Sequence, residues 1–146
     1  MNKWTLLTIF LFLNIFSSFA QSEWANNYGG SNLDQGVDLQ LDNFGNIYTT
    51  GFFEGTVDFD PNNNNSVNLT SVGLRDFYIT KYDALGQLSW AKSIGGGNQE
   101  YSKALQIDGS GNIYVVGDFN GLVDFDPSVG FSLQDVKGAS DIFLAK

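Results

Sequence analysis

Residues 24–61, WANNYGGSNLDQGVDLQLDNFGNIYTTGFFEGTVDFDP, decide the fold because they return 66 positions later as residues 90–127, WAKSIGGGNQEYSKALQIDGSGNIYVVGDFNGLVDFDP. Aligned without a gap, 20 of the 38 positions are identical. After Pro127 the register slips by one residue, so that the stretch from Asp76 matches the stretch from Asp141. A period of this size predicts one supersecondary unit stacked on its copies, because a single unit cannot bury its own apolar face.

Each copy begins with a pattern typical of a β-strand. Val37, Leu39 and Leu41 alternate with polar residues, which predicts a half-buried strand, and Leu105 and Ile107 keep the same phase in the second copy. Glycine- and asparagine-rich turns follow, at residues 42–46 and 108–112. A hairpin into a second strand is therefore expected in both copies.

The other strands of the repeat are expected in matching places. The second strand is β-branched and aromatic on both faces, as in a strand covered from both sides, and it is expected to end at a glycine. The long insert after it is expected to form a small projecting hairpin. The expected second strands are 47–50 and 113–116, ending at Gly51 and Gly117; the third strands are 77–82 and 142–146; the fourth strand is 88–93, with 24–28 as its earlier copy; the inserts are 54–72 and 120–137.

Four short antiparallel strands per repeat predict an all-β chain built of β-propeller blades. Repeat 1 covers about residues 24–89, and repeat 2 covers about residues 90–146 and is truncated. The repeat region opens on a fourth strand and stops after a third, which is the arrangement by which propellers close. Propellers need about four to eight blades, so two blades predict either a fragment of a larger propeller, with further repeats in the full-length chain, or assembly with other copies.

Several motifs resemble a known family. The run from Gly45 to Tyr48, the run from Val57 to Pro61 and the Trp90-Ala91-Lys92 segment occur in the order found in the SBBP-type β-propeller repeat of secreted bacterial proteins, and they are similar to versions from Bacteroidetes. The resemblance covers essentially residues 24–146. It implies a propeller fold and an extracytoplasmic location, and it brings no established catalytic residues.

The first twenty residues predict a secretory signal peptide. Lys3 supplies the positive charge, residues 4–16 form an apolar run, and Ser18-Phe19-Ala20 is a small-x-small cleavage signal. The apolar run is short for a membrane-spanning helix. We therefore expect cleavage before Gln21, a mature region of residues 21–146 without a membrane span, and a secreted, periplasmic or cell-surface location.

The composition excludes several kinds of chemistry. The formal net charge of −9 repels phosphate backbones and disfavours nucleic-acid binding. The chain has no cysteine, so no disulfide can stabilise it. It also has no histidine, which removes Ser-His-Asp and Cys-His catalysis and the usual zinc sites.

Two repeated pairs of aspartates are the candidate metal ligands. Carboxylates two residues apart on an extended segment point the same way and could bind calcium, with Glu54 or Asp76 completing the shell. They could also be charges that protect an exposed edge from aggregation, or the acid and base of a glycosidase. The four residues are Asp58, Asp60, Asp124 and Asp126.

Residues that recur in both copies are expected to serve the fold, whereas residues that differ are better candidates for function. The recurring aromatics are therefore assigned to packing between blades rather than to sugar stacking. The differing positions lie in or beside the inserts, where loops on a rigid scaffold carry binding. The recurring aromatics are Trp24, Trp90, Tyr48 and Tyr114; the differing positions are Phe52 and Asp118, Thr56 and Leu122, and residues 62–65 and 128–130.

The sequence thus predicts a secreted or cell-surface propeller repeat module that binds protein or glycan and has no catalysis and no cofactor beyond calcium. One alternative is the non-catalytic part of an extracellular glycan-active hydrolase or lyase. Another is a structural spacer of an adhesin.

Overall fold

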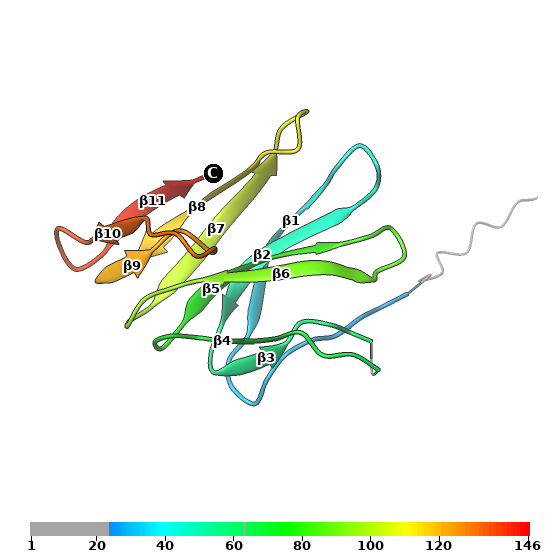
Figure 1. Cartoon of the computed structure of the whole chain (residues 1–146), viewed down its shortest axis with the longest axis horizontal. Helices are drawn as coiled ribbons and strands as arrows, with labels where there is room; N and C mark the ends of the chain where they lie inside the picture. Colours follow the sequence, from blue (N-terminus) through cyan, green and yellow to red (C-terminus); the bar gives the residue numbers. More distant parts are fainter. Residues whose placement is uncertain (1–23, 63) are drawn as a thin grey trace, which may run out of the picture.

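The computed structural model describes residues 24–62 and 64–146, so the predicted signal peptide lies outside the described residues. Every regular element in this part of the chain is a β-strand, which confirms the all-β fold class (Figure 1). None of these residues belongs to a helix long and apolar enough to cross a membrane. The strands are β1 (Gln35–Leu41), β2 (Ile47–Phe53), β3 (Thr56–Asp58), β4 (Asn68–Thr70), β5 (Asp76–Tyr82), β6 (Leu88–Ile94), β7 (Glu100–Ile107), β8 (Ile113–Phe119), β9 (Leu122–Asp124), β10 (Leu133–Asp135) and β11 (Asp141–Ala145).

The two repeats form two antiparallel sheets of the same topology. Repeat 1 has four strands in the order β1-β2-β5-β6. Repeat 2 has three strands, in which β7, β8 and β11 are the counterparts of β1, β2 and β5. The predicted blades are therefore present, one with four strands and one with three among the described residues.

Both inserts form the small hairpins that the sequence predicts. Strand β3 pairs with β4, and β9 pairs with β10, each in a separate two-stranded sheet. The hairpins follow β2 and β8 at equivalent places in the two repeats. Each insert therefore leaves its blade and returns to it without disturbing the order of the main strands.

The expectation of a fourth strand at residues 24–28 is wrong for this structure. This segment has no strand assignment; Asn26 Nδ2 donates to the Gly86 carbonyl at 2.9 Å, and Gly29 forms an isolated bridge with Asp58. A strand forms only when an open edge lies beside it, and β6 finds that edge on β5. The described residues contain no preceding third strand that could do the same for residues 24–28.

The second strands run further than predicted. Strand β2 continues past Gly51 to Phe53, and β8 continues past Gly117 to Phe119. A Cβ at Gly51 would lie 1.9 Å from the Gln35 carbonyl oxygen, so this glycine permits close approach of the neighbouring strand rather than ending its own.

The first turn of each repeat is held by an aspartate. Asp42 Oδ1 accepts from the amides of Phe44 and Asn46, and Gly45 takes a φ of 79°. In repeat 2, hydrogen bonds from Asn112 lower the pKa of Asp108 to about 2. The aspartate side chains thus satisfy the backbone of the turn and stay ionised.

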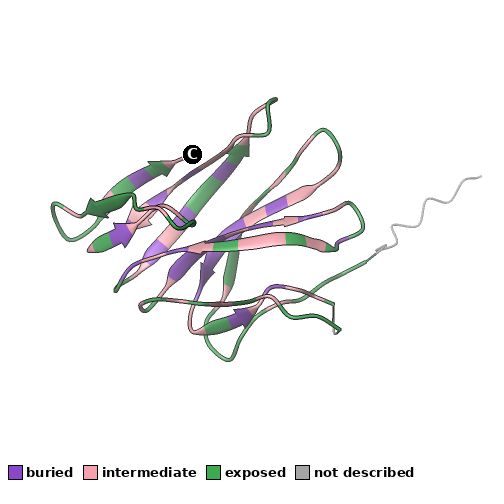
Figure 2. Cartoon of the chain, viewed as in Figure 1, coloured by how far each residue is buried: buried purple, intermediate pink, exposed green. Residues whose placement is uncertain are grey.

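The main core lies between the two sheets. Phe77 of β5 stacks on Phe143 of β11 with ring centroids 4.8 Å apart, and Tyr48 and Leu105 are buried in the same cluster. Figure 2 shows the buried residues concentrated on β2, β5 and β8, whereas β10 is exposed along its length. A second, smaller cluster lies on the other side of the first sheet, beneath the β3–β4 hairpin.

The predicted half-buried face of the first strand is found in repeat 2 only. Leu105 of β7 is 3% exposed, because it faces the first sheet. Its counterpart Leu39 of β1 is 54% exposed, and Leu41 is 61% exposed. The same pattern is therefore covered in one copy and open in the other, because the leucine-bearing face of β7 packs on the first sheet, whereas the corresponding face of β1 points away from the second sheet.

Candidate functional site

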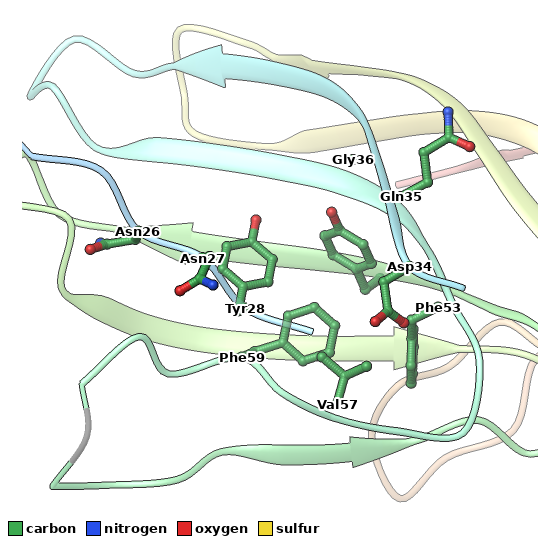
Figure 3. A pocket seen from close by; sticks show the side chains of 10 residues that line it. Asn26, Asn27, Tyr28, Asp34, Gln35, Gly36, Phe53, Val57 and Phe59 are labelled. Carbon is green, nitrogen blue, oxygen red and sulfur yellow. The ribbon is translucent and has the colours of Figure 1, made fainter. Parts of the chain in front are cut away.

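A pocket of about 250 Å³ opens beside the first sheet, next to the segment that precedes β1 (Figure 3). Aromatic side chains form its base and polar side chains form its edge. It is lined by Asn26, Asn27, Tyr28, Asp34, Gln35, Gly36, Phe53, Val57, Phe59 and Tyr78.

The aromatic base is a closely packed group. Phe59 lies 4.9 Å from Tyr78, 5.4 Å from Phe53 and 5.6 Å from Tyr28, measured between ring centroids. Burial raises the pKa of Tyr78, and the neighbouring Tyr28 raises it further. The tyrosine hydroxyl therefore stays protonated at neutral pH, and this side of the pocket is uncharged.

Asp34 provides the negative charge at the pocket edge. Its Oδ2 accepts from the Gly30 amide at 2.7 Å, while its Oδ1 is buried without a hydrogen-bond partner among the described residues. The site combines an apolar base with one carboxylate oxygen, Asp34 Oδ1, that accepts no hydrogen bond from the described residues. It can hold an apolar side chain or ring, and it lacks a neighbouring base or nucleophile at hydrogen-bond distance from Asp34 among the contacts of the described chain.

The predicted metal ligands Asp58 and Asp60 lie at the end of β3 and in the turn that follows. Asp58 Oδ1 accepts from the amides of Asp60 and Val67, at 3.1 and 2.8 Å. Asp60 Oδ1 accepts from the Asn62 amide at 2.9 Å. These carboxylates hold the tip of the β3–β4 hairpin.

The second pair repeats this arrangement. Asp124 Oδ1 accepts from the amides of Asp126 and Ser132, and Asp126 Oδ1 accepts from the amide and hydroxyl of Ser128. The hydrogen bonds from Ser128 lower the pKa of Asp126. Within residues 24–62 and 64–146, no group of three or more acidic side chains is placed to hold a metal ion. Calcium binding by either pair remains a prediction.

The two further ligands considered for calcium have other partners. Glu54 Oε1 forms an ion pair with Arg75 Nε at 2.6 Å. Asp76 is 1% exposed and accepts from the Val72 amide. Both residues therefore serve the junction between the two sheets.

That junction contains polar residues that the sequence did not single out. Arg75 Nη1 donates to the Tyr101 hydroxyl, and the Arg75 guanidinium lies 5.3 Å from the centre of the Phe52 ring. Glu100 is fully buried, and its Oε2 accepts from the Gly96 amide at 2.8 Å. Burial raises the pKa of Glu100 to about 7, with a further rise from the charge of Asp76.

A sequence signal does exist for Asp34 of the pocket and Glu100 of the junction. Asp34 and Glu100 occupy equivalent positions, and each accepts from a glycine amide four residues earlier, Gly30 and Gly96. An acid that recurs four residues after a repeated Gly-Gly pair is thus part of the repeat. Three residues of the pocket base, Phe53, Val57 and Phe59, also recur in repeat 2, as Phe119, Val123 and Phe125, but only the fold shows that these segments meet around a pocket.

The recurring aromatics pack as predicted where the structure shows their contacts. Trp90 meets Tyr48 edge to face, at 6.2 Å, beside the main core. Tyr114 lies under Lys146 Nζ at 5.5 Å, as Tyr48 lies under Lys81 Nζ. This arrangement confirms packing for Trp90 and Tyr48.

The positions that differ between repeats fall into two groups. Phe52 is buried against Tyr101, with ring centroids 5.0 Å apart, whereas its counterpart Asp118 pairs with Lys103 at the surface. The hairpin positions are exposed: Thr56 bonds to Thr70, Leu122 is 54% exposed and Val129 is fully exposed. Among these described positions, the hairpin residues are therefore the most open to a partner.

Comparison with known proteins agrees with this architecture. No family model matches the chain, and no solved structure matches it. The chain is similar to an uncharacterized WD repeat-containing protein, L264, of Acanthamoeba polyphaga mimivirus, with 27% identity over 109 residues. The match covers 66% of this chain, which spans only 8% of the length of that protein. WD repeats form four-stranded propeller blades, so the similarity supports a repeat of the β-propeller type.

Proposed function

We propose that this chain is a β-propeller repeat module that binds a protein or glycan partner and performs no catalysis itself. The observation that carries the proposal is the contrast within the two hairpins. The turn of each hairpin is held by the same aspartate hydrogen bonds, from Asp58 and Asp124, whereas the residues at the tip of the turn differ in sequence. A constant frame that presents different exposed loops is typical of a binding scaffold.

The tip of the β9–β10 hairpin is the stronger binding candidate. Val129 is fully exposed and Phe131 is 84% exposed, although both are apolar. The corresponding stretch of the repeat 1 sequence, residues 62–65, consists of asparagines. An exposed aromatic and aliphatic pair favours protein or sugar contact over a purely solvated turn.

A tip exchange tests this proposal. Residues 128–131 are replaced by residues 62–66, which are four asparagines and a serine, and both chains are immobilised and exposed to purified extracellular-matrix proteins and bacterial polysaccharides. We expect saturable binding of a panel member to the original chain and at least about tenfold weaker binding to the exchanged chain. Phe44→Ser, which changes another exposed apolar residue in the β1–β2 turn, is the matched control and should bind normally.

The alternatives give different results in the same experiment. A chain that binds no panel member supports a structural spacer and contradicts the scaffold proposal. Release of reducing sugar ends from a bound polysaccharide would instead show that the chain itself is catalytic and would contradict the proposal, whereas polysaccharide binding without release would also fit the non-catalytic part of a glycan-active enzyme. Binding that is unchanged by the tip exchange would move the site away from the hairpin.

We also propose that the chain is exported, as the SBBP-type resemblance and the apolar leader at residues 1–20 suggest, and that the propeller is completed either by further repeats in the full-length protein or by other copies of the chain. Expression of all 146 residues in a bacterial host tests the export. The expected product is extracytoplasmic and begins at Gln21 by mass spectrometry. An uncleaved product that stays in the cytoplasm would contradict export.

A further inference from the structure

The outer faces of the two sheets carry apolar residues whose repeat counterparts are buried. On the outer face of the first sheet, Leu39 is 54% exposed, whereas its counterpart Leu105 is 3% exposed. On the outer face of the second sheet, Ile142 is 77% exposed, whereas its counterpart Phe77 is fully buried. We call these surfaces the first face and the second face. Each face corresponds to one half of the junction that already exists inside the chain.

The internal junction shows how the two halves fit. Phe77 of the first sheet stacks on Phe143 at 4.8 Å and lies 6.4 Å from Phe125, both in repeat 2. Phe119 and Val123 complete the surroundings in the same buried cluster. One apolar side chain from the preceding sheet therefore packs among four residues of the following repeat.

The pocket of Figure 3 is the repeat 1 equivalent of the apolar surroundings of Phe77. Its base contains Phe53, Val57, Phe59 and Tyr78, which are the repeat counterparts of the four residues around Phe77. Tyr28 stands at the place of Ile94 and already packs there, 5.6 Å from Phe59. The remaining position of the junction belongs to the counterpart of Phe77, which is Ile142 on the second face.

The strand edges are complementary in the same way. Strand β5 pairs with β2 on one side and with β6 on the other, whereas its counterpart β11 pairs only with β8 among the described strands. Residues 24–28 repeat the Trp-Ala start of residues 90–94, and they lie at the pocket without joining a sheet. The β5–β6 register transfers directly: Phe77 opposite Ile94 predicts Ile142 opposite Tyr28, and Ile79 opposite Lys92 predicts Leu144 opposite Asn26.

We propose that the first face binds the second face of another copy of this chain, head to tail. Ile142 of one copy enters the pocket of the next, and residues 24–28 of that next copy add to the edge of β11 as its fourth strand. A second copy is the fitting occupant because every chain carries both halves, in the register of a junction that it already forms internally. Such a heterologous contact can repeat, and it gives either a closed ring or an open chain.

The contact between copies lacks some of the polar contacts that link the two sheets across the internal junction. Arg75, which links Glu54 to Tyr101 across the internal junction, has Ser140 as its counterpart. Ser102, which donates to the Gly51 carbonyl across that junction, has Gly36 as its counterpart. The association therefore depends on concentration and rests on the apolar and strand-edge contacts. The proposed association shares with the proposed scaffold function only the repeat architecture. It does not depend on which partner binds the hairpin tips.

Sedimentation velocity of the chain beginning at Gln21, over a wide range of micromolar concentrations, tests the proposal. We expect the average mass to rise with concentration, and Ile142→Asp to abolish the rise because it places a charge in the apolar pocket. Ile142 is largely exposed, so this change leaves the fold of the single chain intact. Val129→Asp adds the same charge at an exposed apolar residue outside both faces and should assemble normally.

Cysteine pairing tests the geometry, since the chain has no cysteine of its own. A mixture of Asn26→Cys and Leu144→Cys chains should form the mixed dimer on oxidation in preference to either symmetric dimer. A monomer at every concentration, assembly that survives Ile142→Asp, or crosslinking mainly between two Leu144→Cys chains would each overturn the proposal. These outcomes are distinct from those of the hairpin-tip experiment, which needs no assembly.

Discussion

At the scale of single residues, the two buried carboxylates of the junction have the largest energetic consequence. Glu100 and Asp76 are both shielded from water, and a Cβ at Gly95 would lie 2.1 Å from Asp76 Cγ. Burial raises the pKa of both carboxyl groups, that of Glu100 to about 7. A group whose pKa rises on folding is protonated more readily in the folded chain than in the unfolded chain.

We therefore expect the free energy of unfolding to fall as the pH rises from about 4.5, the ordinary pKa of Glu100, to about 7. The contribution of Glu100 is fully present below this window and lost above it, at up to about 3 kcal/mol. Urea unfolding at pH 5 and pH 7.5 measures the change, and Glu100→Gln should flatten it. Asp135→Asn, at an exposed carboxylate, is the control; an unchanged pH slope in Glu100→Gln would contradict the assignment.

Asp58 makes a second prediction at this scale. Its Oδ1 accepts from two backbone amides that hold the β3–β4 hairpin. Asp58→Ala leaves both amides without this acceptor and should lower the free energy of unfolding by about 1–2 kcal/mol. Asp60→Ala, which removes one exposed hydrogen bond, should cost less. If thermal unfolding showed the same loss of stability for Asp58→Ala and Asp60→Ala, the two hydrogen bonds accepted by Asp58 would contribute no more than the single one accepted by Asp60.

The calcium prediction is tested on the same turns. If the aspartate pairs bind the ion, the melting temperature rises in millimolar calcium relative to chelator, because the ion binds only the folded chain. Asp60→Asn combined with Asp126→Asn should remove the rise. Equal melting temperatures in calcium and chelator would leave the aspartates as turn-forming residues only.

At the scale of the elements, the glycines in β2 and β8 determine how closely the strands pack. A Cβ at Gly51 would meet the Gln35 carbonyl oxygen at 1.9 Å, and one at Gly117 would meet the Tyr101 carbonyl oxygen at 2.0 Å. Both sites adjoin the irregular register of the neighbouring strand. The repeat therefore needs glycine here for backbone proximity, in the middle of a strand.

Gly51→Ala should destabilise the chain by about 1–3 kcal/mol, because the backbone must shift to accept the methyl group. Gly109→Ala is the matched control, since nothing lies within 4 Å of the added Cβ, and it should change stability by less than about 0.5 kcal/mol. Chemical unfolding of the two variants measures the difference. A Gly51→Ala chain as stable as Gly109→Ala would contradict the close approach.

At the scale of the whole molecule, the junction between the two sheets is complete, whereas the first face and the second face are exposed. The internal junction buries Phe77, Leu105 and Phe143 between the sheets. We expect the chain beginning at Gln21 to give a far-UV circular dichroism spectrum dominated by β-structure. A helix content above about one quarter would contradict the fold, because the described residues contain only strands as regular structure.

Local features of this protein followed from the sequence alone. The alternation at Val37, Leu39 and Leu41 predicted β1, the glycine- and asparagine-rich turns predicted the hairpins into β2 and β8, and the 66-residue period predicted two equivalent sheets. These features depend on φ/ψ preferences and on alternation within a few residues, which each copy carries for itself.

What lies opposite each strand was decided by tertiary structure. Leu39 and Leu105 share one pattern, yet one is open and the other is buried, because burial requires a second sheet. Residues 24–28 share the start of β6 but form no strand, because pairing requires an open edge beside them. The pocket beneath the hairpin and the raised pKa of Glu100 arise likewise from residues distant in sequence, which meet only when the sheets pack.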